Sequence, residues 1–219
     1  MKLNKPQVSE NLIQIENFEI TWSEAQMDEM PIRNICLKTY EKEQGDLAKI
    51  DLSNSKIEKC RFMDCDMHNA SFVDVIFENC DFSNSMFQNA YFLRCQFHNC
   101  KFLGCKLQES SVKHCSYSNC VFCYSNFNES YLDCAHMEAC DFTDASMAQV
   151  KFKNWEAYNT IFIHTNFFQT KLRGFDFSEC EMAQIIVSDS LEELRGAKIS
   201  TLQALEIAEM VGVTIADTR

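Results

Sequence analysis

The stretch CDFSNSMFQNAYFLRCQFHNCKF, residues 80–102, carries a phenylalanine at every fifth position. An α-helix repeats every 3.6 residues and a β-strand every 2, so neither element accounts for this period. The same phase runs through twenty-eight positions from Leu52 to Val187, and twenty-seven of them hold a large apolar residue, the exception being Ala157. The period predicts a backbone that turns after each five-residue unit.

A second periodic position lies two residues before each large one. It is Cys, Ala, Ser or Thr at twenty-two of the twenty-eight sites and holds ten of the thirteen cysteines, whereas the other three positions are mostly polar. Each unit therefore buries one large and one small side chain. A chain that closes after four units brings residue i beside residue i+20, so that identical side chains stack in a solenoid.

The motifs CDFSN, AYFLR, CQFHN, ASFVD and CKFLG resemble the pentapeptide-repeat family, in which the small position is Ala, Cys, Ser, Thr or Val and the large position is Leu or Phe. The resemblance covers about residues 50–188. It implies an all-β fold, a right-handed quadrilateral parallel β-helix, followed here by a C-terminal α-helix. Seven coils at a spacing of about 4.8 Å give a rod of about 34 Å.

The chain divides into three predicted parts. Residues 1–47 form an N-terminal cap with degenerate coils, because the repeat weakens there and YEKEQGD interrupts it, which we interpret as a loop near residues 40–46. Residues 48–188 form the β-helix, and residues 189–219 form a C-terminal cap and helix. Within the β-helix, Trp155 and Ala157 exchange the bulky and small roles, which predicts a local bulge or, alternatively, an exposed tryptophan contact.

The C-terminal part carries helix signals. Ser200 and Gln203 have capping-box spacing and Gly212 is a stop, so we expect a helix over residues 201–211. One apolar stripe on this helix either seals the last coil or meets a twofold mate, and the family resemblance implies a homodimer. The stripe consists of Leu202, Leu205, Ala208 and Val211.

Composition limits the class of protein. There are only two prolines and five glycines, no run of eighteen apolar residues, and no apolar signal region near the start, so we expect an ordered cytoplasmic protein without a membrane partner. Thirteen cysteines in such a compartment are expected to be reduced thiols. Cys60, Cys80 and Cys100 are twenty residues apart and would form a parallel column, which does not converge on a metal ion.

No catalytic motif is visible in the sequence. The five histidines fall on different sides and coils, and there is no glycine-rich phosphate loop and no carboxylate pair in a recess. We therefore expect no enzyme activity, no metal and no cofactor.

The net charge of −12 is distributed unevenly over the sides of the predicted coil. The Phe97 side, which also holds Phe77 and Phe177, has six acidic residues and two lysines, and the adjacent Phe102 side, with Phe82 and Phe142, has five acidic residues and two basic ones. The Phe92 side, with Phe72, is instead positive. The acidic residues predicted to bind a partner are Glu58, Glu78, Glu138, Asp141, Asp144, Glu156, Asp176, Glu179 and Glu181.

Acidic sides repel nucleic acid and attract a basic cleft in a protein. The ending LRGAKISTLQALEIAEMVGVTI, the length and the unbroken coils resemble the Qnr-type quinolone-resistance group. That resemblance implies a DNA mimic that binds the type II topoisomerases DNA gyrase and topoisomerase IV and protects them from quinolones. The single register from residue 50 to 187 places the chain with the loop-free kind. The alternative is a pentapeptide-repeat scaffold for another protein partner, with acidic residues that serve solubility only.

Overall fold

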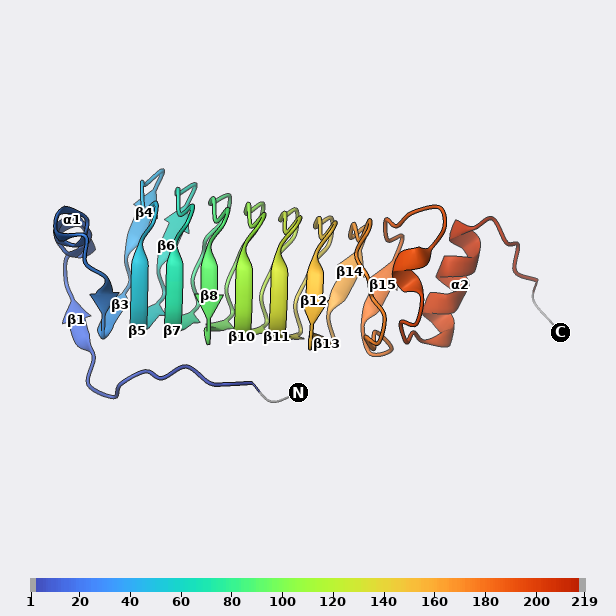
Figure 1. Cartoon of the computed structure of the whole chain (residues 1–219), viewed down its shortest axis with the longest axis horizontal. Coiled ribbons are helices and arrows are strands. Elements are labelled where there is room, and N and C mark those ends of the chain that lie inside the picture. Colours follow the sequence, from blue (N-terminus) through green and yellow to red (C-terminus); the bar gives the residue numbers. More distant parts are fainter. Residues whose placement is uncertain (1–2, 217–219) are drawn as a thin grey trace.

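The chain winds into a parallel β-solenoid of about nine turns, with one helix at each end (Figure 1). The structure is a computed structural model that describes residues 3–216. The strands are β1 (Ile13–Ile15), β2 (Ile32–Arg33), β3 (Ile35–Lys38), β4 (Glu41–Glu43), β5 (Asp51–Glu58), β6 (Arg61–Met63), β7 (Ser71–Glu78), β8 (Tyr91–Leu93), β9 (Gln96–His98), β10 (Ser111–Ser118), β11 (Tyr131–Glu138), β12 (Lys151–Lys153), β13 (Glu156–Tyr158), β14 (Ile161–Ile163) and β15 (Glu181–Ala183), and the helices are α1 (Phe18–Asp28), the single 3-10 turn Glu192–Leu194 and α2 (Thr201–Met210).

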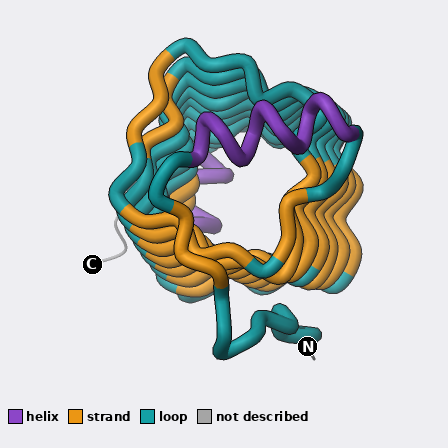
Figure 2. The backbone as a smooth tube through the Cα atoms, turned by 90° about the vertical axis from the view of Figure 1, so that its left-hand side faces the viewer, coloured by secondary structure: helices purple, strands orange, loops and turns teal. Residues whose placement is uncertain are grey.

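Strand pairing follows the predicted offset of twenty residues. Leu52 pairs with Phe72, and Phe72 pairs with Phe92. Four five-residue units close each turn, and the view along the axis shows a four-sided tube (Figure 2). The predicted quadrilateral β-helix is confirmed.

The core consists of the stacked large residues. The ring of Phe97 lies 4.8 Å from that of Phe77 and 4.7 Å from that of Tyr117, with interplanar angles of 4° and 5°. Neighbouring sides meet edge to face, as between Phe97 and Phe102 at 71°. Both arrangements are favourable for aromatic quadrupoles, so the five-residue period is explained by stacking along the axis and edge contacts across it.

The corners of the coil use a left-handed backbone. The residue two places after most of the large ones has φ near +55°, as in Asn79 and Asn99, and ten of these corner residues are asparagine. Asparagine tolerates this region better than other residues with a side chain. The frequency of Asn at this position was a signal for the corners that the reasoning from sequence missed.

At the N-terminus the structure corrects the predicted loop near residues 40–46. β4 pairs with β6, so that Lys42 lies in register with Phe62 and only the residue types depart from the repeat. The degenerate coil is preceded by a helix, α1, which begins after Asn17 and lies across the open end of the tube (Figure 2).

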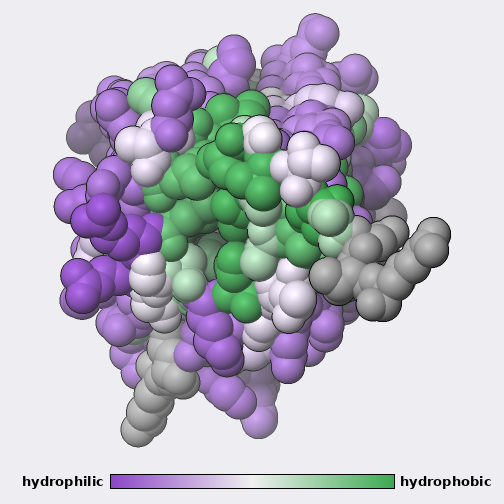
Figure 3. Space-filling model, turned by 90° about the vertical axis from the view of Figure 1, so that its right-hand side faces the viewer, coloured by the Kyte–Doolittle hydropathy of each residue, from purple (hydrophilic) through white to green (hydrophobic). Residues whose placement is uncertain are grey.

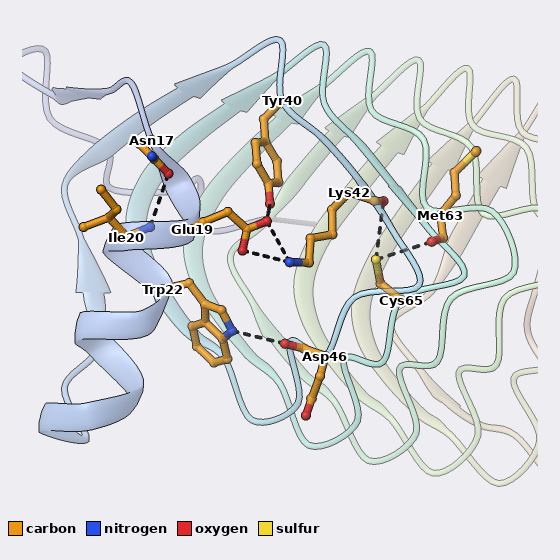
Figure 4. Close-up of polar contacts among 9 residues, drawn as sticks. All are labelled: Asn17, Glu19, Ile20, Trp22, Tyr40, Lys42, Asp46, Met63 and Cys65. Carbon is orange, nitrogen blue, oxygen red and sulfur yellow. Dashed lines mark hydrogen bonds and ion pairs between the residues drawn. The ribbon is translucent and has the colours of Figure 1, made fainter.

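Helix α1 closes the first coil through polar contacts (Figure 4). The indole Nε1 of Trp22 donates to the backbone oxygen of Asp46 at 3.1 Å, and Glu19 accepts from Tyr40 and Lys42. These two partners occupy the small and the large position of one unit. The helix therefore provides hydrogen-bond partners for Tyr40 and Lys42, the polar side chains that stand at inward positions of this coil.

At the C-terminus, α2 has the predicted capping box between Ser200 and Gln203 and ends one residue earlier than expected. Gln203 is buried, and its Nε2 donates to the backbone oxygens of Phe177 at 2.8 Å and Cys180 at 2.7 Å. The last coil is thus sealed by an amide. None of the helices in residues 3–216 is long and apolar enough to cross a membrane. The division of the chain at residues 47 and 188 stays a prediction.

Trp155 is buried, with 4% of its surface exposed, so the alternative of an exposed tryptophan contact is wrong. Phe175 takes the small position in the next coil, and its ring lies 5.4 Å from that of Trp155. Two bulky rings therefore occupy neighbouring sites that elsewhere hold small residues.

Candidate partner-binding surface

The predicted acidic residues fall into two groups that differ in their partners. Glu58 and Glu78 lie side by side in register in the first half of the rod. Lys38 bonds to Glu58 at 2.8 Å, Lys56 contacts Glu58, and Lys56 bonds to Glu78 at 3.1 Å. The hydrogen bond from Lys38 is the main cause that lowers the pKa of Glu58. The two carboxylates are therefore largely neutralised.

The second half of the rod holds a group of acidic residues without such partners. Within residues 3–216 these carboxylates form no ion pair with Lys or Arg, and all but half-buried Asp141 are exposed. Asp144 lies 3.2 Å from Nδ1 of His164. We call this group the acidic patch, and its members are Glu138, Asp141, Asp144, Glu179 and Glu181.

The backbone register brings the patch together from two adjacent sides. Asp141 is bridged to Ile161, which pairs with Glu181, so these two acidic residues lie two coils apart in one column of the Phe102 side. Glu138 pairs with Tyr158 in the neighbouring column across the corner. Two coil steps correspond to about 10 Å, so the patch is compact.

Several predicted acidic residues also stabilise their own turns. Oδ1 of Asp141 accepts from the backbone N–H and the hydroxyl of Thr143, at 2.9 and 2.6 Å. Asp176 makes the same contacts with Ser178 and binds Lys198 at 2.5 Å, and the hydrogen bond from Lys198 is the main cause that lowers its pKa to about 2. Such Asx turns give these residues a structural role independent of any partner.

Glu156 lies between the two groups. It pairs in register with His136, and its carboxylate is 3.6 Å from Nδ1 of that histidine.

The structure adds apolar residues beside the acidic patch that the charge argument missed. Tyr124 and Leu103 lie on the Phe102 side with 66% and 41% of their surfaces exposed. The charge of Asp144 raises the pKa of the Tyr124 hydroxyl. The signal in the sequence was the presence of large apolar or aromatic residues at outward positions of the repeat, which are otherwise mostly polar.

The predicted dimerisation stripe faces outward. Leu202 is 75% exposed, Leu205 40% and Val211 52%, whereas Ala208 is half-buried. The end of the rod shows an apolar area over this helix (Figure 3). Because Gln203 and Ile207 make the inward contacts, the stripe does not seal the last coil.

Candidate metal ligands and thiols are the remaining groups to place within the described residues 3–216. No three His, Cys, Asp or Glu side chains there gather so as to hold a metal ion. All thirteen cysteines are free thiols. Burial raises the pKa of Cys60 to about 12 and raises that of Cys105 further, so these thiols are neutral and unreactive.

Comparisons with known proteins agree with the repeat. A family model described as pentapeptide repeat region matches residues 70–141, and a model of eight pentapeptide repeats matches residues 46–84. No curated protein gives a significant sequence match.

Solved structures with a similar architecture include QnrB1, a plasmid-mediated fluoroquinolone resistance protein, at 20% identity, with 84% of this chain and 90% of that chain covered and a TM-score of 0.46. HetL, a pentapeptide repeat protein involved in heterocyst differentiation regulation in the cyanobacterium Nostoc sp. strain PCC 7120, is 11% identical, with 84% and 94% covered and a TM-score of 0.38. A pentapeptide repeat protein from the Arabidopsis thaliana thylakoid lumen is 15% identical, with 56% and 65% covered and a TM-score of 0.22.

Proposed function

Because this chain is a pentapeptide-repeat protein, we propose that it is a DNA mimic that binds the type II topoisomerases DNA gyrase and topoisomerase IV and protects them from quinolones. The observation that carries the proposal is the acidic patch. Its five carboxylates lack Lys or Arg partners in the described chain and are available to basic residues of another protein. The resemblance of the C-terminal segment to the Qnr-type group supports the same function.

The density of charge in the patch is close to that of DNA. Duplex DNA carries one charge per about 1.7 Å, or about six over 10 Å, and the patch places five carboxylates within about that length. Over the whole rod the likeness is weaker, because Lys38 and Lys56 neutralise Glu58 and Glu78. The mimicry is therefore confined to the second half of the rod.

The apolar end face is the surface through which we propose that the protein dimerises. Leu202, Leu205 and Val211 project from α2 at the end of the rod, and a twofold contact there buries all three on both copies. Such a homodimer extends the rod and presents two acidic patches. We further propose that the protein acts by binding alone, without catalysis, and in the cytoplasm.

A gyrase supercoiling assay tests the function. Purified protein is titrated into the assay with ciprofloxacin, and the expected result is restored supercoiling together with direct binding to gyrase. A protein that neither binds gyrase nor relieves the inhibition is not a topoisomerase protector.

Charge reversal tests the site. Combining Glu138→Lys, Asp144→Lys and Glu181→Lys is expected to weaken gyrase binding tenfold or more, because like charges across an interface cost several kcal/mol. Asp141 is left in place because it holds a turn. The matched control is Glu109→Lys with Glu129→Lys, two exposed acidic residues on a different side of the coil.

The alternative function is a scaffold for another protein, with acidic residues that serve solubility. It is favoured by the turn contacts of Asp141 and Asp176, because these contacts explain the presence of two acidic residues without a role in binding another protein. The charge-reversed protein separates the two functions: a scaffold keeps its partner, whereas a mimic loses gyrase.

A further inference from the structure

The ladder of the solenoid is interrupted next to Trp155. β12 and β13 both pair with β11, but in the described chain no strand or isolated bridge pairs with their other edge (Figure 1). The next coil, residues 171–178, lies beyond this edge without a backbone hydrogen bond to residues 151–155 or 157–159. Pairing resumes at β14, where Ile161 faces Glu181. The break is therefore local to one corner.

The cause of the break is the pair of bulky rings at small positions. Trp155 packs against Phe152 at 4.7 Å and Phe175 at 5.4 Å between ring centroids. The earlier coils hold Ser, Val, Cys or Ala at these sites and keep the ladder spacing of about 4.8 Å. Trp155 and Phe175 meet edge to face at 89° instead of stacking in parallel, and this arrangement needs more room than the ladder spacing allows, so the coils separate.

A cleft of about 460 Å³ occupies the separation. Its residues come from both coils, with Phe152, Trp155 and Phe175 among them, and both signs of charge are present. Lys153 and Arg173 contribute positive charge, and Glu156 and Asp176 contribute negative charge. A Cβ added at Gly174 would meet nothing within 4 Å, which shows open space at this point.

The cleft offers an unpaired strand edge. In regular coils the amides of the large and the corner residue donate to the next coil, as from Phe142 to Ile161 and from Asp144 to Ile163, both at 2.9 Å. The corresponding amides of Phe152 and Asn154 have no such bond in the described chain. A free edge of this kind is a template for another extended strand.

An extended polypeptide already binds to the same corner of the rod, several coils nearer the N-terminus. The chain's own N-terminal segment runs along the outside of the coils (Figure 1). The backbone N–H of Gln7 donates to Asp74 at 2.9 Å, and Nδ2 of Asn54 donates to the backbone oxygen of Gln7 at 2.8 Å. Asn54, Asp74, Asn154 and Gly174 are corner residues spaced by multiples of twenty, so the cleft lies farther along the corner that binds this segment.

We propose that the cleft between residues 152–158 and 173–176 binds an extended segment of a partner protein, which adds as a strand to the free edge of β12. Alternate side chains of such a segment would pack on Phe152 and Phe175, and the others would meet Arg173. This site is separate from the acidic patch and stands whether or not the protein binds a topoisomerase.

The test uses a seven-residue peptide, acetyl-Lys-Val-Glu-Val-Lys-Val-Glu-amide, which alternates apolar and charged residues. The protein carries Trp22→Phe, so that Trp155 is the sole tryptophan and reports on the cleft. The expected result is a saturable change of Trp155 emission with a Kd below about 1 mM. A peptide methylated at alternate backbone nitrogens should not bind, because methylation removes the donors that pair with the strand edge.

Charge substitution supplies the matched control. Arg173→Glu is expected to weaken peptide binding at least threefold, whereas Lys106→Glu, an exposed site on another side of the coil and outside the cleft, should leave the Kd unchanged. Equal binding of the methylated peptide, equal loss in both variants, or no change of Trp155 emission at saturating peptide would each overturn the proposal.

Discussion

Glu19 of α1 accepts two hydrogen bonds from Nζ of Lys42, at 2.7 and 2.8 Å. Lys42 stands in register with Phe62, at a position that holds an apolar residue in almost every other unit. A helix from outside the repeat therefore supplies the counter-charge that lets a lysine begin an aromatic stack. The pair explains how the solenoid ends without exposing its core to water.

This relationship predicts a pH-dependent contribution to stability. Hydrogen bonds from Lys42 and Tyr40 lower the pKa of Glu19 below its ordinary value of 4.5. A lowered pKa in the folded state stabilises the protein above pH 4.5, and this stabilisation is lost as the pH falls through the folded-state pKa. Because Glu19 is half-exposed, Glu19→Gln is expected to cost only about 0.5–1 kcal/mol at pH 7.

Chemical unfolding at pH 7 and pH 3 measures the effect of Glu19→Gln. The difference from the unsubstituted protein should shrink at the lower pH. Glu24→Gln, on the same helix and exposed, is the control and should change stability at neither pH by more than a few tenths of a kcal/mol. Equal losses at both pH values would show that the carboxylate charge of Glu19 is not what stabilises the cap.

The aromatic stack predicts a large loss from a single truncation. Phe97 is 1% exposed and stacks on both Phe77 and Tyr117, so Phe97→Ala is expected to cost about 3–5 kcal/mol. Phe168, which is 40% exposed, provides the matched change, and Phe168→Ala should cost less than about 1 kcal/mol. Urea unfolding of the two variants checks the order.

The corner conformation predicts different effects of two substitutions at one site. Asn89 is exposed, with φ of +58°. Asn89→Ala is expected to destabilise by about 1 kcal/mol, because alanine disfavours this region, whereas Asn89→Gly should be close to neutral. Thermal unfolding distinguishes them, and Lys106→Ala, at an exposed site with negative φ, serves as reference. If Asn89→Ala proved harmless, the corners would not depend on residue type.

The thiols predict a sharp difference in reactivity. Cys123 and Cys134 are half-buried near the surface, whereas Cys60, Cys95 and Cys105 are fully buried. Burial raises the pKa of Cys123 to about 11 and also raises that of Cys134. In the native protein a water-soluble disulfide reagent should therefore label these two slowly, and faster as the pH is raised, and should label the buried cysteines only on unfolding. Mass spectrometry of the labelled peptides identifies the sites. Rapid native labelling of Cys95 would mean that the coils open far more readily than their packing indicates.

The sequence by itself determined the solenoid, its register and its interior. Two of every five residues face inward. With four five-residue units in each turn, residues twenty apart in the sequence stack on one another, as the rings of the Phe97 column do. The capping box of Ser200 and Gln203 was equally local, because it depends on two side chains within one turn of helix. The charge on each side of the coil could be counted because the five-residue register assigns every residue to one side.

Only the tertiary structure decided which charges are free and where the rod is open. Glu58 and Glu138 share one side in the sequence, but Lys38 and Lys56 reach Glu58 and not Glu138. The repeat does not specify the directions in which these lysine side chains extend. Likewise, the repeat marked Trp155 as unusual, but the loss of strand pairing required Trp155 and Phe175 to meet one coil apart. Periodic contacts are dictated locally, whereas ion pairs and packing defects depend on what each side chain meets in space.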